Sequence, residues 1–246
     1  MTETLELYDP LTLVPINIKS VPTFGGRYID ETQSDKYPLT DVWIDRVVIR
    51  AEEFINSTQS WRCDKEQEPG VANKRKGVTS QSGETLHWCV RQSFHSELSF
   101  EIFKRGLFYN HPENEAKYIP SIIDVHHMFN VGPKISAYKN TYKMPWPLTK
   151  RQMLELVITA SPTPKSFYVV SLPLSGQQDD RCVRGMYVSV EYVEEMEDGK
   201  VEWTMATASD AGGNLPRSLQ NPAIPSQIAK DVPHFLAWAK KEFGKS

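Results

Sequence analysis

The residues best suited to acid–base or ligand chemistry are two adjacent histidines in the run IIDVHHMFNV, residues 122–131. The run alternates as a strand does, so His126 and His127 point to opposite faces and cannot chelate one metal ion together. His127 shares a face with the apolar residues Val125 and Phe129, and we expect that face to be inward. An inward His127 is either a core histidine bonded to a neighbour or a polar contact for a ligand.

The next alternating run, from Ile135, places Tyr138, Asn140 and Tyr142 on one face and Lys139 and Lys143 on the other. The lysine face belongs to solvent, so the tyrosine and asparagine face points inward. A solid apolar core does not accept an amide and two phenols without partners, whereas a cavity with a few placed polar groups does. Two interpretations stay open: a ligand cavity, or a Tyr/Trp-rich core whose hydroxyls are satisfied.

The same alternation rule, together with one stripe of a C-terminal helix, completes the predicted lining of this cavity. The residues that we expect to line it are Trp88, His127, Tyr138, Asn140, Tyr142, Leu154, Leu156, Trp203, Met205, Thr207, Ile228, Val232 and Phe235.

The sequence carries no recognised catalytic or metal-binding motif. It contains no GxSxG elbow, no Walker loop and no HExxH. His111 and Glu115 are four residues apart, but His111 lies at a proline-marked helix start, which favours capping and solvent contact over metal binding. We therefore expect no catalytic residue, no metal and no cofactor.

Composition narrows the class of protein. The 246 residues carry a formal net charge of −3, so no global field favours nucleic acid. No window of about 18 apolar residues exists, and the N-terminus MTETLELYDPLTLV is unlike a signal peptide. The three cysteines form no CxxC pair, which indicates reduced thiols. We expect a cytoplasmic monomer that contacts membranes only peripherally.

The first half of the chain predicts an arm, helices and short strands. Residues 1–38 are rich in proline and glycine and read as an irregular arm, either laid over the domain or mobile; residues 39–246 form the domain. The predicted elements are a helix capped by Thr40 or Asp41, strands at 60–67, 76–81 and 85–94, a helix at 100–108, and a second helix after Asn110.

The second half predicts a strand-rich sheet closed by one helix. We expect strands at 122–131, 135–144, 153–161, 166–174, 184–196 and 201–209, with a hairpin turn at 197–199. An amphipathic helix follows, and Pro233 either kinks it or marks a new helix capped by Asp231. The fold class is α+β: a curved antiparallel sheet of about nine strands, wrapped around the last helix with a tunnel between them.

The stretch KMPWPLTKRQM, residues 143–153, separates two of these strands. Met144, Trp146 and Leu148 give it an apolar, aromatic tip, and Pro145 and Pro147 make it stiff. Trp146 suits the membrane interface, where its ring is buried and its N–H stays hydrated. The tip is therefore either a membrane-contacting lip or a loop packed against its own domain.

PWPLTKRQM and a second segment, ASDAGGNLPRSLQNP at 208–222, together resemble the two signatures of START domains. In the second segment Asp210, Gly213, Pro216 and Asn221 match that pattern in order. FYNHPENEAKYI and EWTMATASDAGG are similar to a fungal START-like family. The resemblance covers residues 40–241.

The resemblance implies a helix-grip fold that carries one membrane lipid between membranes. Tyr138, Asn140 and His127 offer more polar partners than one hydroxyl needs, which favours a phospholipid over a sterol. Family members place a charged pair inside the tunnel. The matching segment here, PENEAKYI, lacks the usual charged motif, so we do not assign headgroup recognition to Glu115 or Lys117. Two other functions stay open: an enzyme acting on a hydrophobic small molecule, with His127 as its acid–base group, and a lipid-sensing module. The basic tip at 73–76 is either solvated or drawn to anionic headgroups.

Overall fold

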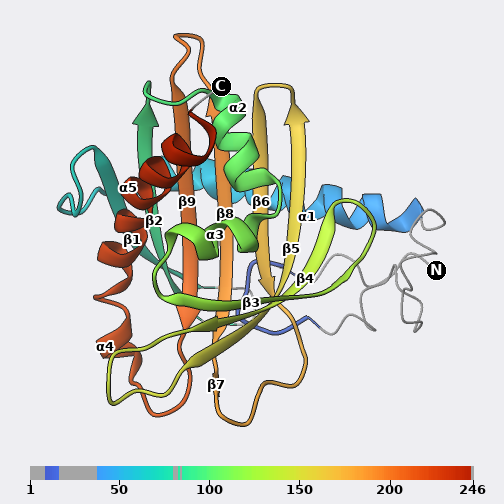
Figure 1. The fold of residues 1–246 in the computed structure, drawn as a ribbon, viewed down its shortest axis with the longest axis vertical. Helices are drawn as coiled ribbons and strands as arrows, with labels where there is room; N and C mark the ends of the chain where they lie inside the picture. Colours follow the sequence, from blue (N-terminus) through green and yellow to red (C-terminus); the bar gives the residue numbers. More distant parts are fainter. Residues whose placement is uncertain (1–8, 17–37, 80–82, 84, 245–246) are drawn as a thin grey trace.

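A computed structural model describes residues 9–16, 38–79, 83 and 85–244 of the chain. One large curved sheet forms the middle layer, and helices cover both of its faces (Figure 1). Helix α1 lies behind the sheet in this view, and α2, α3 and α5 lie in front of it.

The helices are α1 (Pro38–Thr58), α2 (Phe100–Phe103), the π-helical turn η3 (Lys104–Phe108), α3 (His111–Tyr118), α4 (Arg217–Gln220) and α5 (Ile224–Phe243). The strands are β1 (Val71–Thr79), β2 (Thr85–His95), β3 (Ile122–Asn130), β4 (Ile135–Tyr142), β5 (Arg151–Thr163), β6 (Ser166–Pro173), β7 (Val183–Arg184), β8 (Met186–Glu195) and β9 (Val201–Asp210). None of the described helices is both long and apolar enough to cross a membrane.

The sheet has the strand order β1-β2-β9-β8-β6-β5-β4-β3, with the short β7 paired to β5. All neighbouring pairs along this order are antiparallel, and the β5–β7 pair is parallel. The predicted α+β class and the nine-stranded sheet are confirmed. The hairpin turn at 197–199 is also present, with Gly199 at φ 78°, a conformation that glycine adopts without a steric penalty.

The outer face of the sheet packs on α1. Ile44, Val47 and Phe54 of the helix meet apolar side chains from six strands in one buried cluster. Residues 9–16 add to this layer, because Leu11 and Ile16 are buried in the same cluster. This part of the predicted arm is therefore laid over the domain.

The inner face of the sheet packs on α2, η3, α3 and α5. Phe235 of α5 is fully buried, and its ring centroid lies 5.0 Å from that of Trp203 and 5.1 Å from that of Phe103. Helix α5 is therefore in direct ring contact with the sheet and with α2 at this level.

Four predicted elements need correction. Residues 73–76, predicted as a basic tip, lie within strand β1 and pair with β2, and Asn73 and Lys74 are buried. Residues 60–67 form no strand and make only a single bridge, between Cys63 and Lys74. The region predicted as one helix at 100–108 is a short α-helix that widens into a π-helical turn. Helix α5 continues through Pro233, so the alternative in which Asp231 caps a new helix is wrong.

Replacing Phe235 with alanine tests how far α5 depends on its aromatic contacts. The Phe235→Ala variant removes a buried ring from the densest part of the inner layer, and we expect it to lower the unfolding free energy by about 3–5 kcal/mol. Denaturant titration followed by circular dichroism measures this loss. His234→Ala, an exposed neighbour on the same helix, should stay within about 0.5 kcal/mol of the parent. Equal stabilities for the two variants would contradict this account of the core.

Candidate functional site

The inner face brings together most of the residues that the sequence assigned to a cavity. Tyr138, Asn140 and Tyr142 lie side by side on β4, on the face that α5 covers. The other members on this face are Trp203, Met205 and Thr207 of β9 and Ile228, Val232 and Phe235 of α5. Asn140 is fully buried, as the alternation of β4 predicts.

His127 lies opposite Tyr138 on the edge strand β3, with their ring centroids 5.2 Å apart. Its side chain is exposed, and its Nε2 lies 2.7 Å from Oδ1 of Asn130. The residue therefore sits at the rim of the inner face and not within it.

Trp88, Leu154 and Leu156 occupy the opposite face, so the prediction that they point toward α5 is wrong. All three belong to the cluster around α1, and Trp88 packs on Phe54 with ring centroids 4.3 Å apart. The error has a physical cause. Both faces of the sheet are covered by helices, so an apolar side chain can be buried on either face. In this sheet the more apolar face packs on α1, and the face with mixed polarity packs on α5.

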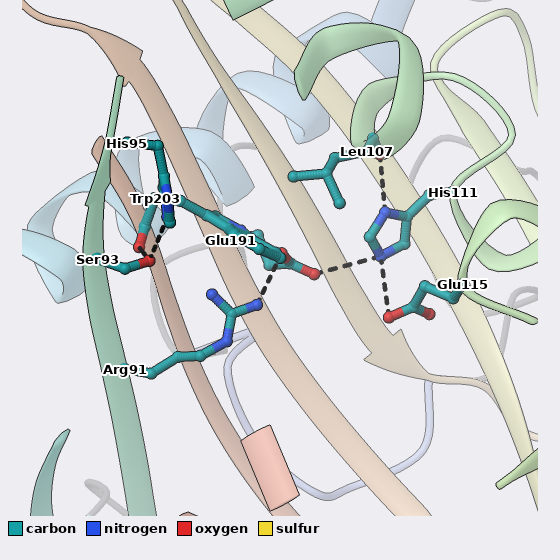
Figure 2. Close-up of polar contacts among 8 residues, drawn as sticks. All are labelled: Arg91, Ser93, His95, Leu107, His111, Glu115, Glu191 and Trp203. Carbon is teal, nitrogen blue, oxygen red and sulfur yellow. Dashed lines mark hydrogen bonds and ion pairs between the residues drawn. The ribbon is translucent and has the colours of Figure 1, made fainter. Parts of the chain in front are cut away.

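A buried ionic cluster lies on this mixed face (Figure 2). Arg91 of β2 is 1% exposed, and its Nη2 lies 3.7 Å from Oε2 of Glu191 on β8. The same carboxylate oxygen accepts a 2.7 Å hydrogen bond from Nε1 of Trp203, and the Arg91 guanidinium stacks on the indole at 3.7 Å from its centroid. Three strands are thus joined by one carboxylate.

His111 completes the cluster from α3. Its Nδ1 donates a 2.7 Å hydrogen bond to the carbonyl of Leu107, which turns Nε2 toward Glu191 Oε1 at 3.3 Å and Glu115 Oε1 at 3.6 Å. Burial alone lowers the pKa of His111, but the charges of Glu115 and Glu191 outweigh burial and raise this pKa to about 9. His111 is therefore buried and cationic, not the solvent-contacting cap that its position predicted.

Further carboxyl groups around the cluster are shifted toward their neutral forms. Burial raises the pKa of Glu115 and of Asp231 on α5 to about 7. Burial, aided by the charge of Glu115, raises the pKa of Glu155 on β5 to about 8. The interior thus holds more carboxyl groups than cations to pair with them.

Several buried polar atoms on the inner face have no hydrogen-bond partner among the described residues. They include Nε and Nη1 of Arg91, both amide atoms of Asn140, and Oε1 of Glu155, although the Asn140 amide lies close enough to Glu155 to lower the pKa of that carboxyl group. Unpaired buried polar groups are costly, and an accumulation of them in one region points to a polar ligand or bound water as the missing partner.

Arg91, His111, Glu115, Glu155, Glu191 and Asp231 were not assigned to the cavity from the sequence. A usable signal existed for the strand residues. Glu155 and Glu191 each stand alone between apolar or aromatic neighbours inside a strand, and in a sheet covered on both faces such a charge must be buried. Arg91 gives a weaker signal, because the polar Gln92 follows it. Nothing in the sequence gives the tertiary contact of His111 with β8.

The loop between β4 and β5 leaves its tryptophan uncovered. Trp146 is 93% exposed, which excludes packing against its own domain, and Met144 and Leu148 beside it are half-buried. At the base of this loop, Arg151 donates hydrogen bonds to the carbonyls of Thr149 and Ala211, each at 2.5 Å. One guanidinium therefore connects this loop to the segment that leads into α5, and so joins the two stretches that resemble START signatures.

A pocket of about 130 Å³ lies on the other side of the sheet, between α1 and the outer face. Lys74, Tyr168, Tyr192 and Glu194 are among its lining residues. It is separate from the inner face and from the ionic cluster.

A family model described as "Protein of unknown function (DUF3074)" matches residues 88–239, which is more than half of the chain. The chain belongs to the DUF3074 family. An uncharacterised protein of Schizosaccharomyces pombe, C577.11, is 26% identical to it over 235 residues, covering 89% of this chain and 96% of that protein.

Solved structures show the fold of this DUF3074 protein to be that of START domains. Human StAR-related lipid transfer protein 5 matches with a TM-score of 0.69 and 11% identity, covering 83% of this chain and 99% of its own. Human STARD10 matches with a TM-score of 0.65 and 15% identity, covering 80% and 84%. The resemblance drawn from the two sequence signatures and the helix-grip fold are confirmed.

The raised pKa of Glu155 predicts a stability that falls with rising pH. The neutral carboxyl favours the folded DUF3074 domain, so its contribution is complete below the ordinary pKa of 4.5 and is lost as pH rises through about 8. The loss between pH 5 and 9 is at most about 5 kcal/mol from this group. Denaturant titrations across this range should give a flatter profile for Glu155→Gln. A variant that keeps the slope of the parent would contradict the assignment.

Proposed function

We propose that this DUF3074 protein takes one membrane lipid into the space between its sheet and α5 and carries it between membranes. The observation that carries this proposal is the set of unpartnered polar atoms buried on the inner face, on Arg91, Asn140 and Glu155. The shared fold with a human lipid transfer protein supports the same function.

The unpartnered atoms offer both donors and acceptors to a lipid headgroup. Arg91 has unused N–H donors on Nε and on Nη1, which lie on different edges of the guanidinium plane, and each of them suits a phosphate oxygen. Asn140 donates and accepts through one amide, and Glu155, in its neutral form, does the same through one carboxyl. A ligand hydroxyl, ester or amine satisfies these last two groups.

A phospholipid fits this set better than a sterol does. A sterol brings a single hydroxyl group, which leaves most of the buried donors and acceptors unpaired. A phospholipid headgroup supplies several oxygen atoms at once, including charged ones that face Arg91. The buried Tyr138 contacts the ring of His127 at the rim, and this pair extends the polar end toward solvent.

Extraction from the membrane depends on kinetics more than on affinity. Each methylene group removed from water gains about 0.8 kcal/mol, but the bilayer already provides that gain. The barrier is the passage of the tails through water. A protein that inserts an apolar tip into the bilayer lowers this barrier, because the tails then move along a continuous apolar path.

Met144, Trp146 and Leu148 form this tip in the proposed mechanism. The exposed indole of Trp146 inserts at the interface, and Pro145 and Pro147 limit the entropy lost on insertion. Helix α5 is the opposing lid: it must shift from the aromatic contacts of Phe235 to admit the tails. The chain acts as a monomer, with one lipid per protein.

The enzyme alternative rested on His127 as an inward acid–base group. His127 is exposed on the edge strand and bonded to Asn130. Its position gives no support to catalysis by that residue.

Removing the indole should slow transfer without unfolding the protein. For Trp146→Ala we expect fluorescent-lipid transfer between liposomes to slow about tenfold, since the lost interfacial burial is worth about 1.5 kcal/mol. The melting temperature should not change, because the side chain makes almost no contact with the domain. Phe94→Ala removes another exposed ring, on β2, and serves as the matched control. A transfer rate that is equal in Trp146→Ala and in the control would rule out the tip.

Native mass spectrometry after incubation with mixed liposomes tests the function directly. One bound phospholipid per chain is expected, and a chain that takes up no lipid would overturn the proposal. Asn140→Leu should reduce the bound phospholipid at least tenfold relative to sterol, since an apolar side chain cannot pair with the headgroup.

A purely structural Asn140 would give a different result. In that case Asn140→Leu removes a buried amide without partners, so stability rises and the bound lipid stays the same. Thr204→Val is the control, because Thr204 is buried on the outer face and its hydroxyl is bonded to Glu202.

A further inference from the structure

The atoms of His111, Glu115 and Glu191 that face one another have the spacing of metal ligands. Nε2 of His111 lies 3.3 Å from one glutamate oxygen and 3.6 Å from the other, and the three atoms all lie within 4.8 Å of one another. Ligands bound at about 2.0–2.2 Å to a tetrahedral metal ion stand about 3.3–3.6 Å apart. The two measured separations therefore fit edges of such a tetrahedron.

Two of the three ligands are already oriented by neighbours. Nδ1 of His111 is bonded to the Leu107 carbonyl, which fixes Nε2 as the free ring atom. The oxygen of Glu191 that does not face His111 is held by Trp203 and Arg91, so that Oε1 remains directed at the histidine. Outer contacts of this kind are typical of metal-binding histidines and carboxylates.

The charges around this group favour an additional cation. The carboxyl groups of Glu115, Glu191, Glu155 and Asp231 act electrostatically on one another or on shared neighbours. The cations that act on these carboxyl groups are His111 and the guanidinium groups of Arg91 and Arg184, and Arg184 also donates to the carbonyl of Leu174. A divalent ion held by His111, Glu115 and Glu191 adds positive charge beside these four carboxyl groups.

The guanidinium beside Glu191 is incompletely paired. Arg91 is 1% exposed and leans on Glu191, yet its Nε and Nη1 have no partner among the described residues (Figure 2). A water molecule, hydroxide or phosphate oxygen in the fourth position of a metal ion would accept from such donors.

We infer that His111, Glu115 and Glu191 form a binding site for a divalent transition-metal ion, with Zn²⁺ favoured by the one-nitrogen, two-oxygen ligand set. The spacing of His111 and Glu115 on one helix face is the only part of the site visible in the sequence. The site shares Arg91 with the lipid proposal, but none of its three ligands belongs to the unpartnered set that carries that proposal.

Calorimetric titration of the full chain, first stripped with a chelator and then titrated with ZnCl₂, tests the site. We expect one Zn²⁺ per chain in the parent protein and a loss of affinity of at least tenfold in both His111→Gln and Glu115→Gln. Glu115 is less buried than His111, so its variant keeps the test valid if His111→Gln fails to fold. His95→Gln, which replaces a buried histidine bonded to Ser93 outside the cluster, should bind as the parent does.

Cobalt provides a second measurement on the unaltered protein. Co²⁺ in a tetrahedral site absorbs strongly in the visible range, and in an octahedral aqueous shell it absorbs weakly. A strong band that Zn²⁺ abolishes is the expected result. No zinc uptake by the parent, equal uptake by all the variants, or only the weak cobalt band would overturn the inference.

Discussion

The carboxylate of Glu191 is the interaction on which the inner face depends. One oxygen accepts from Trp203 and faces Arg91, and the other faces His111. Strands β2, β8 and β9 and helix α3 are therefore connected through a single side chain that is almost completely buried. The pKa of Glu191 is held below its ordinary value because the bond and charge of His111, with Arg91, overcome the effect of burial. Loss of any one partner leaves a charge in the interior without compensation, and such losses are among the most damaging changes to a folded protein.

This dependence explains why the two faces of the sheet differ. The outer face meets α1 through aliphatic and aromatic side chains and needs no specific partners beyond shape. The inner face combines an aromatic layer around Phe235 with a polar layer around Glu191 and Glu155. The aromatic layer holds α5 in place through its contact area. The polar layer is stable only when its buried charges are paired. The contacts with α1 can therefore hold the sheet in its fold while polar groups on the inner face change their hydrogen-bond partners.

The sequence predicted the elements better than their contacts. Period-two alternation identified β2 to β6, β8 and β9, because each has apolar side chains on at least one face. It failed for 60–67, where alternation has no neighbouring strand to pair with beyond one bridge. The choice of face was right for β4, where lysines mark the other side, and wrong for Trp88, Leu154 and Leu156, where both sides are covered. Periodicity cannot show that α3 brings His111 onto β8, since that contact joins residues 80 positions apart along the chain.

Arg151 gives the proposed carrier a property that neither of its movable parts has alone. Its guanidinium is shared between the base of the Trp146 loop and the stretch entering α5, so displacing one side removes hydrogen bonds from the other. In the proposed mechanism, insertion of the Trp146 tip and release of the α5 lid are therefore coupled. By the same proposal, the hydrogen bonds of Arg151 hold the loop and the lid together while the protein is away from a bilayer, so the bound lipid stays enclosed in water.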